Sequence, residues 1–368
     1  MKKRKSKNLS TDQSLTDIIF HITPVLIIIF VFEIVAIQMY ISSPLYKSWK
    51  LFFLWIGMQA IGSIVLGYIS DKKCRKTTLI FTQISAVFFL IIILFFKFNL
   101  ISIALLALSF NPSPIARAAT IDNFPSYSKV KLIAITFIAQ FLPWSFYLQI
   151  SKIKSINILI VCIIAIIINI IITVFLFKDK RDIAMLKHPT LASMKSKKLF
   201  FTIGALLPAQ IVFFLADSFF EGMPHNAGVF SALGVGSLVG TLLSLFYRKV
   251  PHISFLTICY GIGVILAAVT LFTTLFLPLT NINLSYQLMM FSTLGGFYLP
   301  FLYDVILSSS LSTFRGTACG MIDGIISLSA IIGLSLILIL QPKALVVLII
   351  TTLLFSSSTI LQKIGEKK

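Results

Sequence analysis

The chain alternates long apolar runs with short polar interruptions along its 368 residues. Each run is close to the roughly 20 residues that an α-helix needs to cross a bilayer. We therefore expect an all-α polytopic membrane protein with twelve transmembrane helices. The expected helices cover residues 18–40, 49–70, 77–97, 99–119, 129–150, 156–177, 199–221, 226–247, 252–278, 283–308, 316–340 and 343–362.

The longest polar interruption, residues 178–198, predicts how the chain is divided. It is basic, and we expect a cytoplasmic linker between two six-helix bundles, 18–177 and 199–362. Short cytoplasmic tails, 1–17 and 363–368, complete the expected organisation.

An internal repeat supports this division. A proline and an acid stand nine residues apart in Pro24 and Glu33, and again in Pro208 and Asp217. The pair Gly-Ser also recurs, at residues 62–63 and 236–237. These matches indicate a duplicated six-helix unit, the kind of repeat found in many secondary transporters.

Lysine and arginine gather on one side of the expected membrane. The chain has 31 Lys and Arg against 12 Asp and Glu, a formal net charge of +19. If the N-terminus is cytoplasmic, 25 of these 31 cations fall on the cytoplasmic side, which is the positive-inside pattern. We therefore interpret the charge as topological and expect no nucleic-acid partner. The composition, rich in Ile, Lys and Phe, favours a bacterial protein. The charge pattern favours an inner-membrane orientation with both termini cytoplasmic.

Several kinds of chemistry have no signature in the sequence. The four cysteines are too widely spaced to indicate a disulfide framework or a metal site. Nucleotide-binding, metalloprotease and serine-hydrolase motifs do not occur. We expect no enzyme activity, no cofactor and no metal.

The turn Gly67–Lys76 packs four cations and one aspartate between two apolar runs. Its spacing, G-x-x-x-D-K-x-x-R-K, resembles the signature between the second and third helices of the major facilitator superfamily of secondary transporters. Cys74 stands where that family has its second glycine. A second phrase, Asp122-x-x-Pro-x-x-x-Lys129, resembles the family pattern at the inner end of helix four.

The resemblance implies two pseudo-symmetric six-helix halves around a central cavity lined by helices one, four, seven and ten. It also implies inner-face ion pairs that close a cytoplasmic gate. The gate residues implied here are Gly67, Asp71, Arg75, Asp122, Lys129 and Arg315. The signature also resembles those of sugar porters and metabolite/proton symporters, and no stretch fixes a subfamily.

Ionisable groups within the apolar runs are the candidates for function, because a charge inside a bilayer is costly. The acids are Glu33, Asp217, Glu221, Asp304 and Asp323, of which we expect Glu221 at the outer surface. Removal from water disfavours the charged form of a carboxyl, so such an acid can exchange a proton during transport. A structural acid paired with a neighbouring helix is the alternative. The expected proton and solute site comprises Glu33, Asp217, Asp304, Arg117, Asn111, Gln140 and Trp144.

Two of these roles stay open at the level of sequence. Arg117 could bind a substrate carboxylate or belong to the gate. Trp144 shares a helical face with Gln140 by spacing, where an aromatic ring could hold a solute or anchor the helix.

The function that fits these patterns is proton-coupled movement of a small solute by alternating access, carried out by a monomer in the lipid bilayer. The expected cavity is acid-biased, which favours a cationic or zwitterionic solute. Predicted helix 129–150 lacks glycine, whereas drug/proton antiporters of the family carry a glycine- and proline-rich motif there, so uptake is favoured. The alternatives are a multidrug or metabolite efflux antiporter and a non-transporting membrane sensor or scaffold.

Overall fold

The computed structural model describes residues 15–42, 49–96, 100–177, 179, 201–212, 227–247, 253–276, 281–309, 312–340 and 344–367. The regular structure of these residues is entirely helical. The first half of the chain contains α1 (Leu15–Ser42), α2 (Trp49–Lys72), α3 (Arg75–Phe96), α4 (Leu100–Ser109), α5 (Ser113–Asn123), α6 (Lys129–Ser145), α7 (Tyr147–Ile150) and α8 (Ser155–Leu176). The second half contains the helix Phe201–Val212, α10 (Ala227–Leu245), α11 (Ile253–Phe276), α12 (Asn281–Ser309), η4 (Ser312–Phe314), α13 (Arg315–Leu340) and α14 (Ala344–Lys367).

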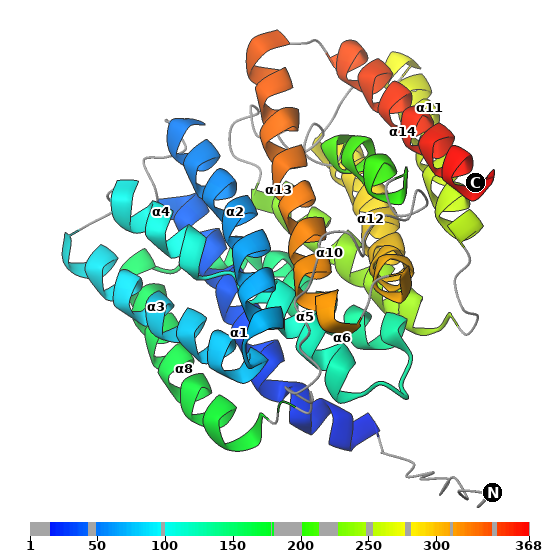
Figure 1. Ribbon diagram of the computed structural model, residues 1–368. Helices are drawn as coiled ribbons and strands as arrows, with labels where there is room; N and C mark the ends of the chain where they lie inside the picture. The colour runs from blue at the N-terminus through cyan, green and yellow to red at the C-terminus, as the bar shows by residue number, and fades with distance from the viewer. Residues whose placement is uncertain are drawn as a thin grey trace, which may run out of the picture.

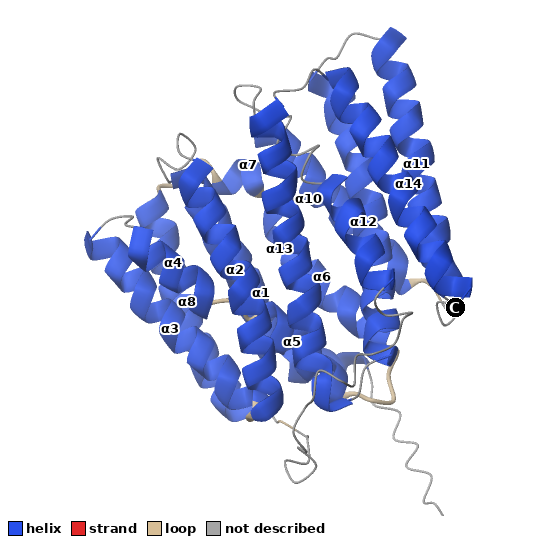
Figure 2. Cartoon of the chain, turned by 45° about the horizontal axis from the view of Figure 1, so that its top comes forward, coloured by secondary structure: helices blue, strands red, loops and turns tan. Residues whose placement is uncertain are grey.

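The helices form one bundle in which helices from the two halves of the chain lie side by side (Figure 1). Helices α3 and α8 pack together at one edge, and α11 and α14 pack together at the opposite edge (Figure 2). Between them, α2 packs against α13 and α6 packs against α10. The centre of the bundle is therefore built by helices from both halves.

The outer surface of the bundle is suited to lipid. Among the described residues, seven helical spans are long and apolar enough to cross a membrane. Large apolar side chains point outward from the edge helices, with Phe88 59% exposed, Phe95 79% and Ile164 52%. An exposed apolar surface of this kind would be unfavourable in water. The helices and their outward faces thus agree with the predicted polytopic membrane protein.

Two predicted helices are interrupted in the structure. The helix expected at 99–119 is split into α4 and α5 around Asn111 and Pro112, and α5 then continues to Asn123. Proline lacks an amide hydrogen and obstructs the preceding turn, which accounts for the split. The helix expected at 129–150 is likewise divided, because Phe146 leaves the helical conformation three residues after Pro143. The last helix extends to Lys367, beyond the predicted end of the span at residue 362.

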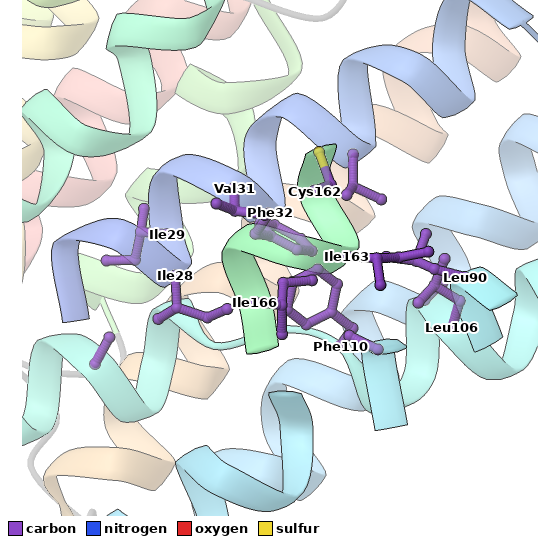
Figure 3. Packing of buried hydrophobic residues seen from close by; sticks show 14 of the residues in the cluster. Ile28, Ile29, Val31, Phe32, Leu90, Leu106, Phe110, Cys162, Ile163 and Ile166 are labelled. Carbon is purple, nitrogen blue, oxygen red and sulfur yellow. The ribbon is translucent and has the colours of Figure 1, made fainter. Parts of the chain in front are cut away.

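The first half has a core of interlocking apolar side chains (Figure 3). Phe110, at the interruption between α4 and α5, packs edge-on against Phe32 of α1, with ring centroids 5.2 Å apart. Ile163 and Ile166 of α8 belong to the same cluster. This packing fixes the break in the fourth span against α1, one residue away from Glu33.

A second apolar core includes residues from both halves. Ala118, Val130 and Phe137 of α5 and α6 pack in one cluster with Tyr298 and Tyr303 of α12. The middle of the molecule is therefore a shared interior.

Equivalent glycines reveal the repeat in the packing. A side chain at Gly62 of α2 would meet the backbone of Leu108 on α4, and one at Gly236 of α10 would meet the backbone of Met289 on α12. The same close approach thus joins α2 to α4 in the first half and α10 to α12 in the second half. This correspondence agrees with the duplication expected from the sequence.

Candidate functional site

Two polar clusters interrupt the apolar interior. The first, here called the ionic cluster, consists of Asp71, Arg75, Asp122 and Arg315. Arg75 pairs with Asp71 at 3.1 Å and with Asp122 at 2.7 Å. Arg315 pairs with the second oxygen of Asp122 at 2.7 Å. The cluster joins the ends of α2 and α5 to the starts of α3 and α13, at one end of the bundle.

Asp71 connects this cluster to the first turn of α13. Its carboxylate accepts hydrogen bonds from the backbone amides of Gly316, at 2.9 Å, and Thr317, at 2.6 Å, and from the Thr317 hydroxyl, at 2.8 Å. Amides in the first turn of a helix have no partner within the helix and favour a negative charge. Asp71 therefore holds α2 and α13 together by charge as well as by hydrogen bonding.

Gly67 allows the two helices to approach. A side chain there would overlap the backbone carbonyl of Gly316. Gly320 of α13 likewise faces the backbone of Ser63 on α2. The glycines thus permit the backbone contact that places Asp71 next to the first turn of α13.

Lys129 lies in a different contact from the ionic cluster. Its ammonium donates to Ser308 at 3.0 Å, and the Ser308 hydroxyl donates to Asp304 at 3.2 Å. Asp304, which the sequence placed in the solute site, is therefore positioned with a predicted gate residue at the end of α12. Sequence reasoning also missed Asp179, whose carboxylate accepts from the Arg75 amide at 2.7 Å and so caps α3.

We expect Asp71→Asn to loosen the end of the bundle at which the ionic cluster lies. The substitution removes the charge that pairs with Arg75, and breaking a buried pair by removing one partner is strongly destabilising, by about 3–5 kcal/mol. Cys74 provides a reporter, because it is partly exposed beside the cluster whereas Cys162, Cys259 and Cys319 are buried. Maleimide labelling of Cys74 should become several-fold faster. Thr317→Val, which removes one hydroxyl and leaves the backbone contacts, should change the rate much less. Equal labelling rates for Asp71→Asn and the unmodified protein would contradict a closing role.

The second polar cluster, here called the Arg117 cluster, lies deeper in the bundle. Arg117 is five residues before Asp122, or about 7.5 Å further along α5 at 1.5 Å per residue. Its guanidinium is buried between the rings of Phe137 and Tyr303, 4.2 and 4.9 Å from their centroids. It pairs with Asp323 of α13 at 2.6 Å.

Hydrogen bonds around Arg117 connect helices of both halves. Arg117 donates to the Tyr303 hydroxyl at 2.9 Å and to the side-chain carbonyl of Gln140. The Tyr303 hydroxyl in turn donates to Asp323. A guanidinium with its fixed fork of donors is suited to joining several acceptors in this way. The Arg117 cluster therefore links α5 and α6 to α12 and α13.

Glu33 completes the cluster from α1. The residue is 5% exposed, and its carboxylate accepts a hydrogen bond from the Trp144 indole at 2.9 Å. The Gln140 side chain is an electrostatic neighbour of Glu33. The Trp144 ring stacks on Tyr147, with centroids 6.1 Å apart. The polar chain thus runs from Asp323 through Arg117 and Gln140 to Glu33.

The structure brings together only part of the predicted site. Glu33, Arg117, Gln140 and Trp144 meet in the Arg117 cluster. Asn111 lies at the break before α5 and donates to the Ser63 hydroxyl at 2.6 Å, which connects α5 to α2. Asp217 and Glu221 lie outside the described residues.

Asp323 and Tyr303 are the site residues that the sequence prediction left out. Asp323 was recognisable as an isolated acid within an apolar run. Its partner Arg117 is 206 residues away, and only the tertiary structure shows this pairing.

Comparison of the sequence alone does not identify a protein family for the chain. No family model and no curated protein sequence matches it. Solved structures do match. The structure of the Escherichia coli fucose:proton symporter superposes with a TM-score of 0.72, at 11% identity, over 95% of this chain and 99% of that one. A second structure of that transporter, described as a major facilitator superfamily transporter in the outward conformation, gives 0.69, at 10% identity, over 94% and 98%.

The chain has the fold of the major facilitator superfamily. Two further structures agree. A human organic anion transporter matches with a TM-score of 0.70, at 13% identity, over 94% of this chain and 98% of that one. A bacterial homologue of the iron transporter ferroportin, in its outward-facing state, gives 0.70, at 13% identity, over 95% and 100%. The predicted major facilitator fold, with twelve transmembrane helices in two six-helix halves, is thereby confirmed. At these identities the likeness concerns the fold alone.

Proposed function

We propose that the protein is a secondary active transporter that moves a small polar solute by alternating access, coupled to protons. The observation that carries this proposal is the buried Arg117–Asp323 pair, at 2.6 Å, between α5 of the first half and α13 of the second. A charged group in the middle of a membrane bundle is costly and marks a solute or ion pathway by default. This pair also lies where relative movement of the two halves would separate it.

The proposal extends to topology. The ionic cluster is the cytoplasmic gate, and residues 178–198 form a cytoplasmic linker between six-helix bundles 18–177 and 199–362. Both termini are then cytoplasmic, in a bacterial inner membrane, and the protein acts as a monomer. Uptake is favoured because α6 contains no glycine, unlike the corresponding helix of drug/proton antiporters. The fucose:proton symporter among the structural matches supports symport with protons.

The proton site that we propose comprises the carboxylates flanking Arg117. Asp323 is paired directly with the guanidinium, and Glu33 lies beyond Gln140. When the Arg117 guanidinium binds a solute instead, Asp323 loses its cationic partner inside a low-dielectric interior. Uptake of a proton then removes the cost of an unpaired buried charge.

The proposal is tested with proteoliposomes that contain the purified protein and carry an imposed inward proton gradient. Asp323→Asn keeps an oxygen that can accept from Arg117 and Tyr303, but it cannot exchange a proton. We expect accumulation of solute against its gradient to disappear, while counterflow between equal internal and external solute remains measurable. Accumulation at the unmodified rate by Asp323→Asn would remove this acid from the coupling.

A further inference from the structure

Gln140 occupies an unusual position between opposite charges. Its carbonyl oxygen accepts a hydrogen bond from the Arg117 guanidinium, and its side chain is also an electrostatic neighbour of the Glu33 carboxylate. Because an ionised carboxylate only accepts hydrogen bonds, the amide NH₂ is the group that faces Glu33. The negative end of the amide dipole thus meets the cation, and the positive end meets the anion.

The same arrangement of charge occurs in a free α-amino acid. An amide separates its nitrogen from its oxygen by about 2.3 Å, and an α-amino acid separates its ammonium nitrogen from the nearer carboxylate oxygen by about 2.7 Å, from standard bond lengths. A zwitterion of that size would fit between the same two charged groups with its carboxylate toward Arg117. A γ-amino acid, at more than about 4.5 Å when extended, would not.

Unused hydrogen-bonding capacity points to a ligand at this place. Within the described part of the chain, Arg117 Nε and Asp323 Oδ2 are buried and have no hydrogen-bond partner. Buried polar atoms in proteins are nearly always satisfied. A carboxylate delivered to Arg117 could use the free Nε–H.

We propose that the solute is a small zwitterion with the charge spacing of an α-amino acid. The Gln140 amide occupies the position of this solute when no solute is bound. The solute carboxylate binds Arg117, its ammonium binds Glu33, and the Gln140 amide withdraws. This inference rests on the proposed transport function and names the class of solute for that same site.

The arrangement also explains why a proton would travel with the solute. Asp323 faces Arg117 and Tyr303, with Cys319 on its own helix and Glu33 across the cluster. When the solute carboxylate takes Arg117, a proton on an Asp323 oxygen keeps this group neutral. Solute and proton then occupy the cluster together, as symport requires.

The test is equilibrium binding to the purified full chain, by isothermal titration, for a panel of neutral L-α-amino acids. The tightest binder is then compared with its own carboxamide, which lacks the anion, and with its desamino acid, which lacks the cation. Each analogue leaves one buried charge unpaired, so we expect both to bind at least about thirtyfold more weakly. γ-Aminobutyrate serves as the spacing control and should not bind measurably.

Gln140→Leu provides the sharper variant, because the sign of its effect separates two roles. If Gln140 holds the place of the solute, its loss should tighten zwitterion binding by about fivefold, the net effect of relieving one hydrogen bond. If Gln140 instead binds the solute directly, its loss should weaken binding. Gln149→Leu, at an exposed position on α7, is the matched control and should bind as the unmodified protein does.

Three binding results would overturn the inference. These are weaker binding by Gln140→Leu, equal binding of the desamino acid, and no binding of any zwitterion by the unmodified protein or by Gln140→Leu. Proton-driven accumulation of an uncharged sugar or nucleoside in proteoliposomes would also overturn it, yet would leave the proposed function intact. Conversely, tight zwitterion binding without accumulation at any proton gradient would reject proton-coupled transport and keep the assigned class of ligand.

Discussion

Gly67→Ala should prevent the close contact between α2 and α13, here called the α2–α13 seam, from forming. Transport should fall to below about a tenth of its normal rate. A methyl group at this position overlaps the backbone carbonyl of Gly316, and backbone cannot rotate away as a side chain can. Overpacking typically costs about 1–3 kcal/mol. Here that cost falls on the closed state, because the contact is made there, so the end bearing the ionic cluster should open.

The measurement combines solute counterflow with maleimide labelling of Cys74, which should accelerate as it does for Asp71→Asn. Gly57→Ala is a matched control on the same helix, since a methyl group there would lie 3.8 Å from the Ile331 side chain, an ordinary contact. Normal transport by Gly67→Ala would show that the seam does not need its backbone approach.

Arg117→Leu should destabilise the protein and abolish transport. The substitution leaves Asp323 and Glu33 buried without the cation between them, and removing one partner of a buried pair costs about 3–5 kcal/mol. Thermal unfolding of the purified protein in detergent should therefore begin at a clearly lower temperature. Solute counterflow should fall to the background of empty liposomes.

The double variant Arg117→Leu/Asp323→Leu separates stability from function. Replacing both members of a buried pair by apolar side chains is often neutral or stabilising, so the unfolding temperature should largely recover. Transport should remain absent, because no guanidinium faces the solute. Recovery of transport together with stability would remove Arg117 from the transport site and assign it a structural role.

The sequence predicts the helices well because each span needs a long apolar run, and such runs are visible without a partner. The turn Gly67–Lys76 also indicates an ion pair that the structure contains, since Asp71 and Arg75 are close in the chain and pair with each other. Lys129 and Asp304 were assigned to different sites, although both contact Ser308. Contacts of that kind depend on how α6 and α12 pack, which no local pattern encodes.

The same limit applies to the deeper cluster. Glu33 and Arg117 stand out in the sequence because they are isolated charges in apolar runs. Gln140 lies between them because α6 packs against both α1 and α5. The pairing with Asp323 requires the two halves to be docked, so local sequence could suggest the participants but not their arrangement.

The contacts between the halves have a consequence for biogenesis. Arg117 and Asp71 belong to the part of the chain that leaves the ribosome first, whereas their partners Asp323, Gly316 and Thr317 all lie on α13. Until α13 is inserted, the first half of the chain (α1–α8) contains a buried cation and a buried anion that lack these partners. An isolated first half, or two copies of it, should therefore be degraded in the cell, and coexpression with the second half should rescue it. Each half therefore depends on the other to pair one buried charge, Arg117 in the first and Asp323 in the second.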